Sequence, residues 1–184
     1  MNALIAAKLT GASSGPICPT LVAMLDRIGE THWLRFRSAD ELFGAASHLL
    51  QTTSVLETPV FLSDGRNYIG TPNMTRTGVL KEQLMSGFAK AIETLGDTYY
   101  LPLGPKVSEA MLFLSSNGRL DSTRILHGMP RSSPANMERI NYFLGKKPCD
   151  ELSEKCWLAG RSTGELDPKG RVNRSSVNPL RSTT

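Results

Sequence analysis

The chain has 184 residues, and its hydrophobic fraction of 40% supplies one packed core of ordinary size rather than two. No run of eighteen apolar residues occurs, and the opening residues 1–8 are too few for a signal peptide, so we expect a cytoplasmic protein without membrane contact. The formal net charge is +4, and +3 of it comes from the five basic and two acidic residues after residue 160. Residues 1–160 are therefore nearly neutral, which argues against nucleic acid wrapping broadly around them by electrostatic attraction. A local basic patch is still compatible with this charge.

The cysteines and histidines do not follow the spacing of a disulfide framework or a metal site. They are Cys18, Cys149, Cys156, His32, His48 and His127. The cysteines are odd in number and lack a C-x-x-C spacing. We therefore expect reduced thiols and no metal or organic cofactor.

The first elements in chain order are a helix, a strand and a second helix. Apolar spacing predicts a helix over 19–28, and alternation of apolar and polar residues predicts a strand over 32–36. Ser38 and Glu41 have the spacing of a capping box, which predicts that a helix begins there. Its apolar stripe extends to Leu50.

A strand, a loop and a long helix are predicted next. Residues 53–62 are rich in β-branched and large apolar residues, but Pro59 has no amide proton and should end regular pairing there. Turn residues follow at 63–67. The apolar periodicity of residues 79–95 predicts a helix that is closed by Gly96.

The remaining elements continue the alternation of strands and helices. Residues 98–103 predict a strand, and a helix begins at Pro105, where the missing amide costs nothing, and ends at Gly118. A short strand over 124–126 and a helix over 136–144, with Asn136 as its N-cap, complete the pattern.

Strands that alternate with helices predict an α/β fold. We expect a three-layer α/β/α architecture with a central, mostly parallel sheet over residues 1–160. One alternative is that N-terminal elements of this fold are missing. Residues 161–184 are poor in apolar side chains, so they predict a disordered basic tail.

The loop from Pro130 to Asn136 is the stretch in which we expect binding chemistry. It follows a predicted strand and precedes a helix, and open α/β folds bind ligands at that edge of the sheet. Ser132, Ser133 and the backbone amides of the helix start are donors for an anion such as phosphate, and Arg131 adds a fixed positive charge. The alternative is a rigid connector whose polar residues face water.

Residues 125–136, ILHGMPRSSPAN, resemble the second motif of the uracil-DNA glycosylase superfamily. That motif has a His-Pro-Ser-Pro core, which enters the DNA minor groove beside the extruded nucleotide. Arg131 stands at the histidine position, and Ser132, Ser133 and Pro134 stand at the other three. The resemblance implies that Arg131 stabilises charge on the departing base. The residues implied to contact DNA are Pro130, Ser132, Ser133, Pro134, Asn136 and Arg139.

A second match supports the same family. Residues 58–62 and 65–68 are similar to a block of the single-strand-selective monofunctional branch, and residues 95–105 resemble the family's penultimate strand and helix. The resemblance covers about 47–147. It implies a base pocket formed by Ser54, Pro59, Phe61 and Asn67, in which the Ser54 hydroxyl makes one of the two hydrogen bonds that the family's asparagine makes.

The family's first motif, which positions the attacking water, has no clear equivalent. The nearest candidate is the segment 11–16, GASSGP, and no strand is predicted before it. Either the N-terminal portion is absent or it has diverged.

The resemblance therefore implies a monomeric DNA-binding protein that hydrolyses the N-glycosidic bond of uracil or a related damaged base in single-stranded DNA, or in a duplex with an extruded base. The first alternative is a catalytically inactive relative that binds nucleic acid or a protein partner. The second is a shortened form of an active enzyme.

Overall fold

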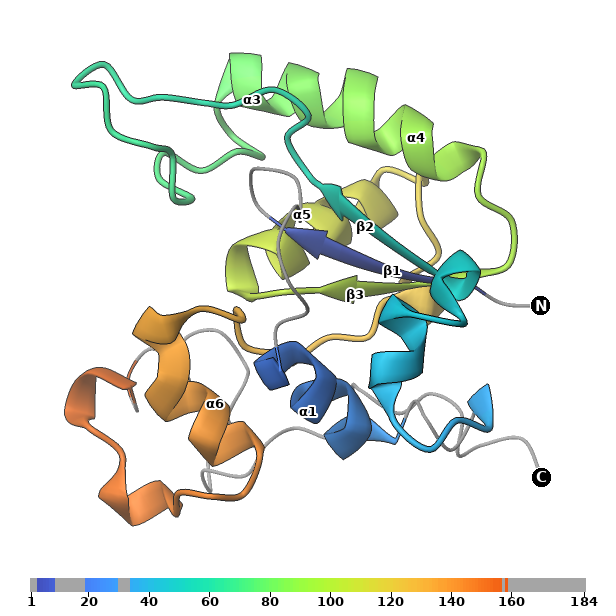
Figure 1. The fold of residues 1–184 in the computed structure, drawn as a ribbon. Helices are drawn as coiled ribbons and strands as arrows, with labels where there is room; N and C mark the ends of the chain where they lie inside the picture. Colours follow the sequence, from blue (N-terminus) through green and yellow to red (C-terminus); the bar gives the residue numbers. More distant parts are fainter. Residues whose placement is uncertain (1–2, 9–18, 30–33, 157, 159–184) are drawn as a thin grey trace. The chain divides into compact units, whose positions relative to one another are not determined.

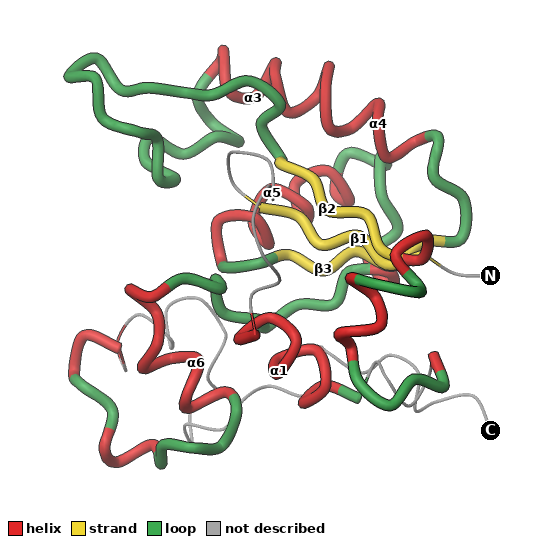
Figure 2. Tube along the Cα trace, in the orientation of Figure 1, coloured by secondary structure: helices red, strands yellow, loops and turns green. Residues whose placement is uncertain are grey.

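The computed structural model describes residues 3–8, 19–29, 34–156 and 158, and it is a mixture of helices and strands, as predicted (Figures 1 and 2). The strands of the described chain are β1 (Ala3–Lys8), β2 (Leu50–Ser54) and β3 (Thr98–Pro102). Its α-helices are α1 (Pro19–Ile28), α3 (Gly78–Gln83), α4 (Ala89–Glu93), α5 (Pro105–Ser116) and α6 (Met137–Phe143). Short 3-10 helices and one π-helix join these elements.

The described residues divide into two compact units. The first unit contains 3–8 and 50–125, and the second contains 19–29, 34–49, 126–156 and 158. The predicted boundary at residue 160 and the predicted tail lie outside the described residues, so both stay predictions.

The strands of the first unit form a parallel sheet in the order β2-β1-β3. Leu4 pairs with Leu50, and Ala3 pairs with Thr98. We predicted no strand before residue 11, and that expectation is wrong. The segment is alanine-rich and has low strand propensity, so it becomes a strand because it pairs on both sides.

One apolar cluster forms the core of the first unit. Residues from the loop after β2, from the helices and from Tyr100 of β3 contribute to it. Its most deeply buried members include Val55, Leu84, Phe88, Ala110, Met111 and Leu114. The side chains at Leu84 and Phe88 belong to a π-helical turn (Leu84–Phe88) that joins α3 to α4 without a break. The long helix predicted from residue 79 is therefore confirmed, although its π-helical turn was not expected.

The helices α1 and α5 also agree with their predictions. The N-cap of α5 is Gly104, which has φ 101°, a backbone conformation that glycine adopts more easily than other residues. Pro105 occupies the first helical position, and Asn117 ends the helix. The sequence patterns that mark the start, the apolar face and the end of this helix thus predicted it correctly.

The strand predicted over 32–36 is wrong for its described part. Leu34 is helical and Arg35 lies in a turn with φ 61°, a conformation through which an extended chain cannot continue. His32 and Trp33 lie outside the described residues. Ser38 is the N-cap that we predicted, but the helix that it begins is a 3-10 turn (Ala39–Phe43). It ends well before Leu50, where β2 starts.

Two further boundaries differ from the predictions. The strand predicted over 53–62 lies at Leu50–Ser54, so Pro59 falls in a loop. The strand predicted over 124–126 is reduced to one bridge between Ile125 and Tyr100, because a capped 3-10 turn (Ser122–Arg124) precedes it.

The residue that closes α4 also differs from the prediction. The C-cap is Thr94 rather than Gly96. The Thr94 hydroxyl donates to the carbonyl of Ala91 at 2.9 Å, which satisfies one of the last helical carbonyls. No glycine in the left-handed conformation is therefore needed at this helix end.

Candidate functional site

A long loop, residues 55–77, leaves the carboxyl end of β2 in the first unit. Its middle is a hairpin in which Phe61 and Asn67 pair in an antiparallel bridge. The Tyr68 amide donates to the Val60 carbonyl at 3.0 Å. Parallel α/β proteins bind ligands where the strands end, so this loop occupies the position of a functional loop.

The two faces of this hairpin differ in burial. Tyr68 is 2% exposed, and its hydroxyl donates to the Pro72 carbonyl at 2.6 Å. Burial, with a smaller contribution from the negative charge of Glu109, raises the pKa of Tyr68. Because side chains alternate along a hairpin, the neighbours of Tyr68 face the other way, and Phe61 is 62% exposed.

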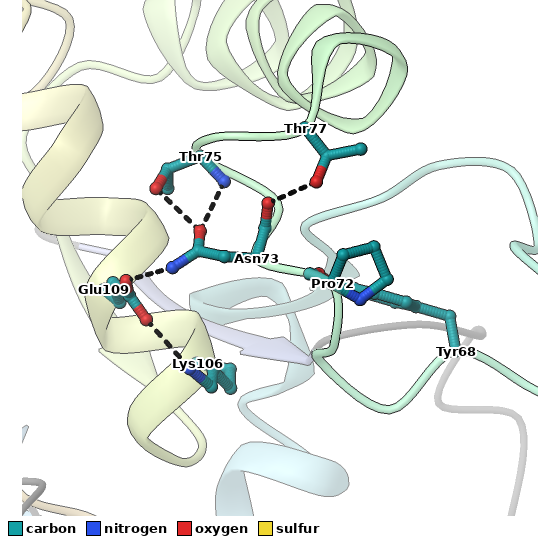
Figure 3. A network of polar contacts seen from close by, with 7 residues as sticks. All are labelled: Tyr68, Pro72, Asn73, Thr75, Thr77, Lys106 and Glu109. Carbon is teal, nitrogen blue, oxygen red and sulfur yellow. Dashed lines mark hydrogen bonds and ion pairs between the residues drawn. The ribbon is translucent and has the colours of Figure 1, made fainter.

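A polar network fixes the end of the loop to α5 (Figure 3). Asn73 Nδ2 donates to Glu109 Oε1 at 2.5 Å, while Asn73 Oδ1 accepts from both the amide and the hydroxyl of Thr75 at 2.8 Å. The Thr77 hydroxyl donates to the Asn73 carbonyl at 2.8 Å. Lys106 Nζ lies 3.2 Å from Glu109 Oε2. The side-chain nitrogen, the side-chain oxygen and the backbone carbonyl oxygen of Asn73 therefore all make hydrogen bonds.

Glu109 carries a negative charge within this network. Burial alone raises the pKa of its carboxyl group, but hydrogen bonds from Asn73 and Lys106, and the charges of Lys106 and Arg76, lower it further than burial raises it. The pKa therefore lies below its ordinary value. At neutral pH the carboxylate is ionised, and its hydrogen bond with Asn73 is charge-assisted.

The loop passes close to α5 at Gly70, and its backbone conformation there favours glycine. Gly70 has φ +109°, and a Cβ atom there would lie 2.7 Å from Lys106 Cγ. The Lys106 side chain can move, so the backbone conformation is the larger constraint.

We expect Gly70→Ala to lower the free energy of unfolding by about 1–3 kcal/mol, because alanine is strained at this φ. Urea denaturation measures the change. The matched control is Gly78→Ala, since Gly78 begins α3 and a Cβ atom there would meet no atom of the described residues within 4 Å. Equal losses in both variants would contradict the assignment of strain to position 70.

The second unit presents Arg131 on a tightly bonded loop. The Arg131 carbonyl accepts from the Ser133 amide at 2.9 Å and from Asn136 Nδ2 at 3.2 Å. Met129 and Pro130, which precede it, are buried, whereas the Arg131 side chain is exposed. The backbone of this arginine is therefore fixed on both sides while its guanidinium group faces solvent.

This geometry corrects two expectations about the loop. The amides of Ser133 and Asn136 both donate within the chain, so they are not free donors for an anion. Asn136 is the N-cap of α6, as predicted, but its side chain makes no cap bond and instead donates to Arg131 and to Ser133 Oγ at 3.0 Å. The positive charge of Arg131 is the main anion-binding feature that remains.

Glu138 ties the first turn of α6 to the segment that follows the helix. Its carboxylate accepts from Lys147 Nζ at 2.7 Å, from the Ser153 amide at 2.8 Å and from the Ser153 hydroxyl at 2.6 Å. These hydrogen bonds, with that of Lys147 largest, lower the pKa of Glu138 from 4.5 to about 2. Lys147 is therefore engaged within the chain.

A lowered pKa makes stability depend on pH. The unfolded chain binds a proton at Glu138 near pH 4.5 and the folded chain near pH 2, so this contribution is complete above about pH 4.5 and is lost as the pH falls toward 2. We expect Glu138→Gln to flatten this part of the pH profile of the unfolding midpoint. Ser153→Ala should flatten it in part, and a wild-type slope in Glu138→Gln would contradict the assignment.

The structure separates the predicted site residues into two sets. The pocket residues Ser54, Pro59, Phe61 and Asn67 belong to the first unit, and the DNA-contacting residues belong to the second. Phe61 and Asn67 are brought together by their bridge, and Ser54 ends β2. Pro59 and Asn67 are exposed, whereas Arg139 on α6 is half-buried. The candidate first motif at 11–16 lies outside the described residues.

Several residues of the network were missed in the sequence. Asn73 with Thr75 has the spacing of an Asx-turn, and Lys106 with Glu109 has the i, i+3 spacing of a helical ion pair. Both of these local patterns could have been recognised in the sequence. The bond between Asn73 and Glu109 could not, because it joins residues 36 positions apart.

A comparison with curated proteins finds a similar chain. The chain is 32% identical over 142 residues to the uncharacterized protein YoxB of Bacillus subtilis (strain 168). The match covers 76% of this chain and 55% of YoxB, so the chain spans about half the length of this relative. No protein-family model and no solved structure matches the chain. In the described part of the chain, no helix has the length and apolar character that a membrane span requires.

Proposed function

We propose that this chain is a uracil-DNA glycosylase-like protein that binds DNA and hydrolyses the N-glycosidic bond of uracil or a related damaged base. The observation that carries the proposal is the exposed guanidinium group of Arg131 on a loop whose backbone is held by Ser133 and Asn136. The surrounding residues 125–136 resemble the family's second motif. A fixed backbone with an exposed charge suits a side chain that must contact a DNA strand in one defined geometry.

The proposed architecture is a three-layer α/β/α sandwich with a central parallel sheet. Two observations support it. Both strand pairings are parallel, and successive residues of β3 are buried, with Tyr100 3% exposed and Leu101 0% exposed. Since successive side chains point to opposite faces, both faces of this strand are covered, as parallel sheets require.

The proposed chemistry begins with extrusion of the nucleotide, because the bond is inaccessible within the base stack. Water then adds across the bond between the sugar C1′ and the base, so the oxygen joins the sugar and the base departs with the bonding electrons and takes up a proton. Arg131 stabilises the negative charge that develops on the departing base. By the resemblance, Phe61 and Asn67 of the first unit, with Ser54 and Pro59, recognise the base. The protein acts as a cytoplasmic monomer.

The alternative is an inactive relative that keeps the binding surface. Arg131 in place of the family's histidine favours it, because a guanidinium group is longer and directs its donors differently. Under this alternative, the chain would bind DNA without releasing a base.

One assay distinguishes these functions. The protein is incubated with single-stranded and duplex oligonucleotides that carry one uracil, and abasic sites are then cleaved with alkali. Identical oligonucleotides with thymine are the control. Cleavage at the uracil supports the enzyme, and binding without cleavage supports the inactive relative. Absence of binding at low salt, where phosphate contacts are strongest, would exclude both.

A further inference from the structure

The exposed hairpin of the first unit belongs to a loop that is hydrogen-bonded to α5. The loop of residues 55–77 is long, and Phe61 and Asn67, which the resemblance assigns to the base site, are exposed. Loops longer than about 15 residues that have little secondary structure of their own are uncommon in compact domains and are usually functional or disordered. Tyr68 and Met74 of the loop are buried in the core cluster, so apolar packing and polar contacts both hold the hairpin.

Hydrogen bonds within the loop hold the residues that follow the hairpin. Tyr68, which is buried, donates its hydroxyl hydrogen to the Pro72 carbonyl at 2.6 Å, and Asn73 organises the turn into α3 through Thr75 and Thr77. These contacts give the loop its internal shape. They do not by themselves connect it to the helix that follows β3.

Glu109 makes the connection from α5. Its Oε1 atom accepts the Asn73 amide at 2.5 Å, and its Oε2 atom accepts from Lys106 at 3.2 Å, one helical turn earlier (Figure 3). Lys106 in turn packs beside Gly70. One carboxylate thus links the turn at Asn73 to the helix whose lysine contacts the same loop.

We infer that Glu109 is a positioning residue for base recognition, which acts by holding the hairpin through the Glu109–Asn73 hydrogen bond. The inference rests on the proposed function, because it assigns the hairpin to the base site. It adds a residue outside the predicted pocket to the determinants of specificity.

The test compares binding to two oligonucleotides that resist hydrolysis. Both are single-stranded and carry a 2′-fluorinated sugar at one position, since fluorine disfavours positive charge at C1′; one has uracil there and the other has thymine. The wild-type chain should bind the uracil form more tightly. Glu109→Ala should reduce this preference about tenfold, because the Asn73 amide loses its partner, and should leave the affinity for the thymine form unchanged.

Two further variants separate positioning from general stability. Glu109→Gln keeps an oxygen that accepts from Asn73 but loses the charge facing Lys106, so it should retain most of the preference. Glu93→Ala removes a carboxylate on α4 that pairs with Arg119 rather than with the loop, so it should keep the full preference. Hydrogen exchange of residues 66–77 should increase in Glu109→Ala and not in Glu93→Ala.

The outcomes distinguish this inference from the function on which it rests. If the wild-type chain does not prefer uracil, the proposed base recognition is wrong and the role of Glu109 falls with it. If the wild-type chain prefers uracil and Glu109→Ala keeps that preference, or Glu93→Ala loses it equally, the function stands and the inference is overturned.

Discussion

Replacing Arg131 with alanine is expected to lower the single-turnover rate of uracil release about 100-fold to 1,000-fold. The guanidinium group supplies positive charge where the departing base becomes negative, and alanine supplies none. The backbone of the loop should persist, because its hydrogen bonds use the Arg131 carbonyl rather than its side chain. The measurement is quenched cleavage of a uracil oligonucleotide under excess protein.

Arg37→Ala is the matched control for this experiment. Arg37 is an exposed arginine of the same unit, so both variants lose one positive charge. A general electrostatic effect on DNA binding would slow both variants to a similar extent. A rate in Arg131→Ala within about twofold of the wild type would remove Arg131 from the chemistry, since loss of a charge-stabilising group costs far more than this.

Phe88→Ala is expected to lower the free energy of unfolding by about 3–5 kcal/mol. Phe88 is 1% exposed and lies at the end of the π-helical turn, inside the core cluster of the first unit. Truncation removes the transfer free energy of the ring and leaves a cavity. Urea denaturation followed by circular dichroism measures the loss.

Phe61→Ala makes the same chemical change on the surface. Phe61 is 62% exposed, so the free energy of unfolding should change by less than about 0.5 kcal/mol. Under the proposed function, this variant should bind the uracil oligonucleotide more weakly although it remains stable. If both phenylalanine variants unfold at the same urea concentration, the core position of Phe88 is wrong.

The sequence predicted more of the candidate site residues and their surroundings in one unit than in the other. The loop around Arg131 was found because its prolines, serines and asparagine stand together. The structure adds that the side chain of Asn136, the N-cap of α6, donates to the Arg131 carbonyl instead of making a cap hydrogen bond. In the first unit Phe61 and Asn67 were named, and their bridge follows from a short hairpin. The support of that hairpin by Glu109 was not predicted.

The sequence by itself determined the helices α1 and α5 and the long helix that begins at Gly78, because start signals and apolar spacing act between residues three or four positions apart. Tertiary structure decided that Ala3–Lys8 is the middle strand of the sheet and that Asn73 meets Glu109. Strand pairing and long-range hydrogen bonds join segments tens of residues apart, and their free energy is gained when the chain packs. An alanine-rich segment therefore becomes a strand through its neighbours, whatever its own propensity.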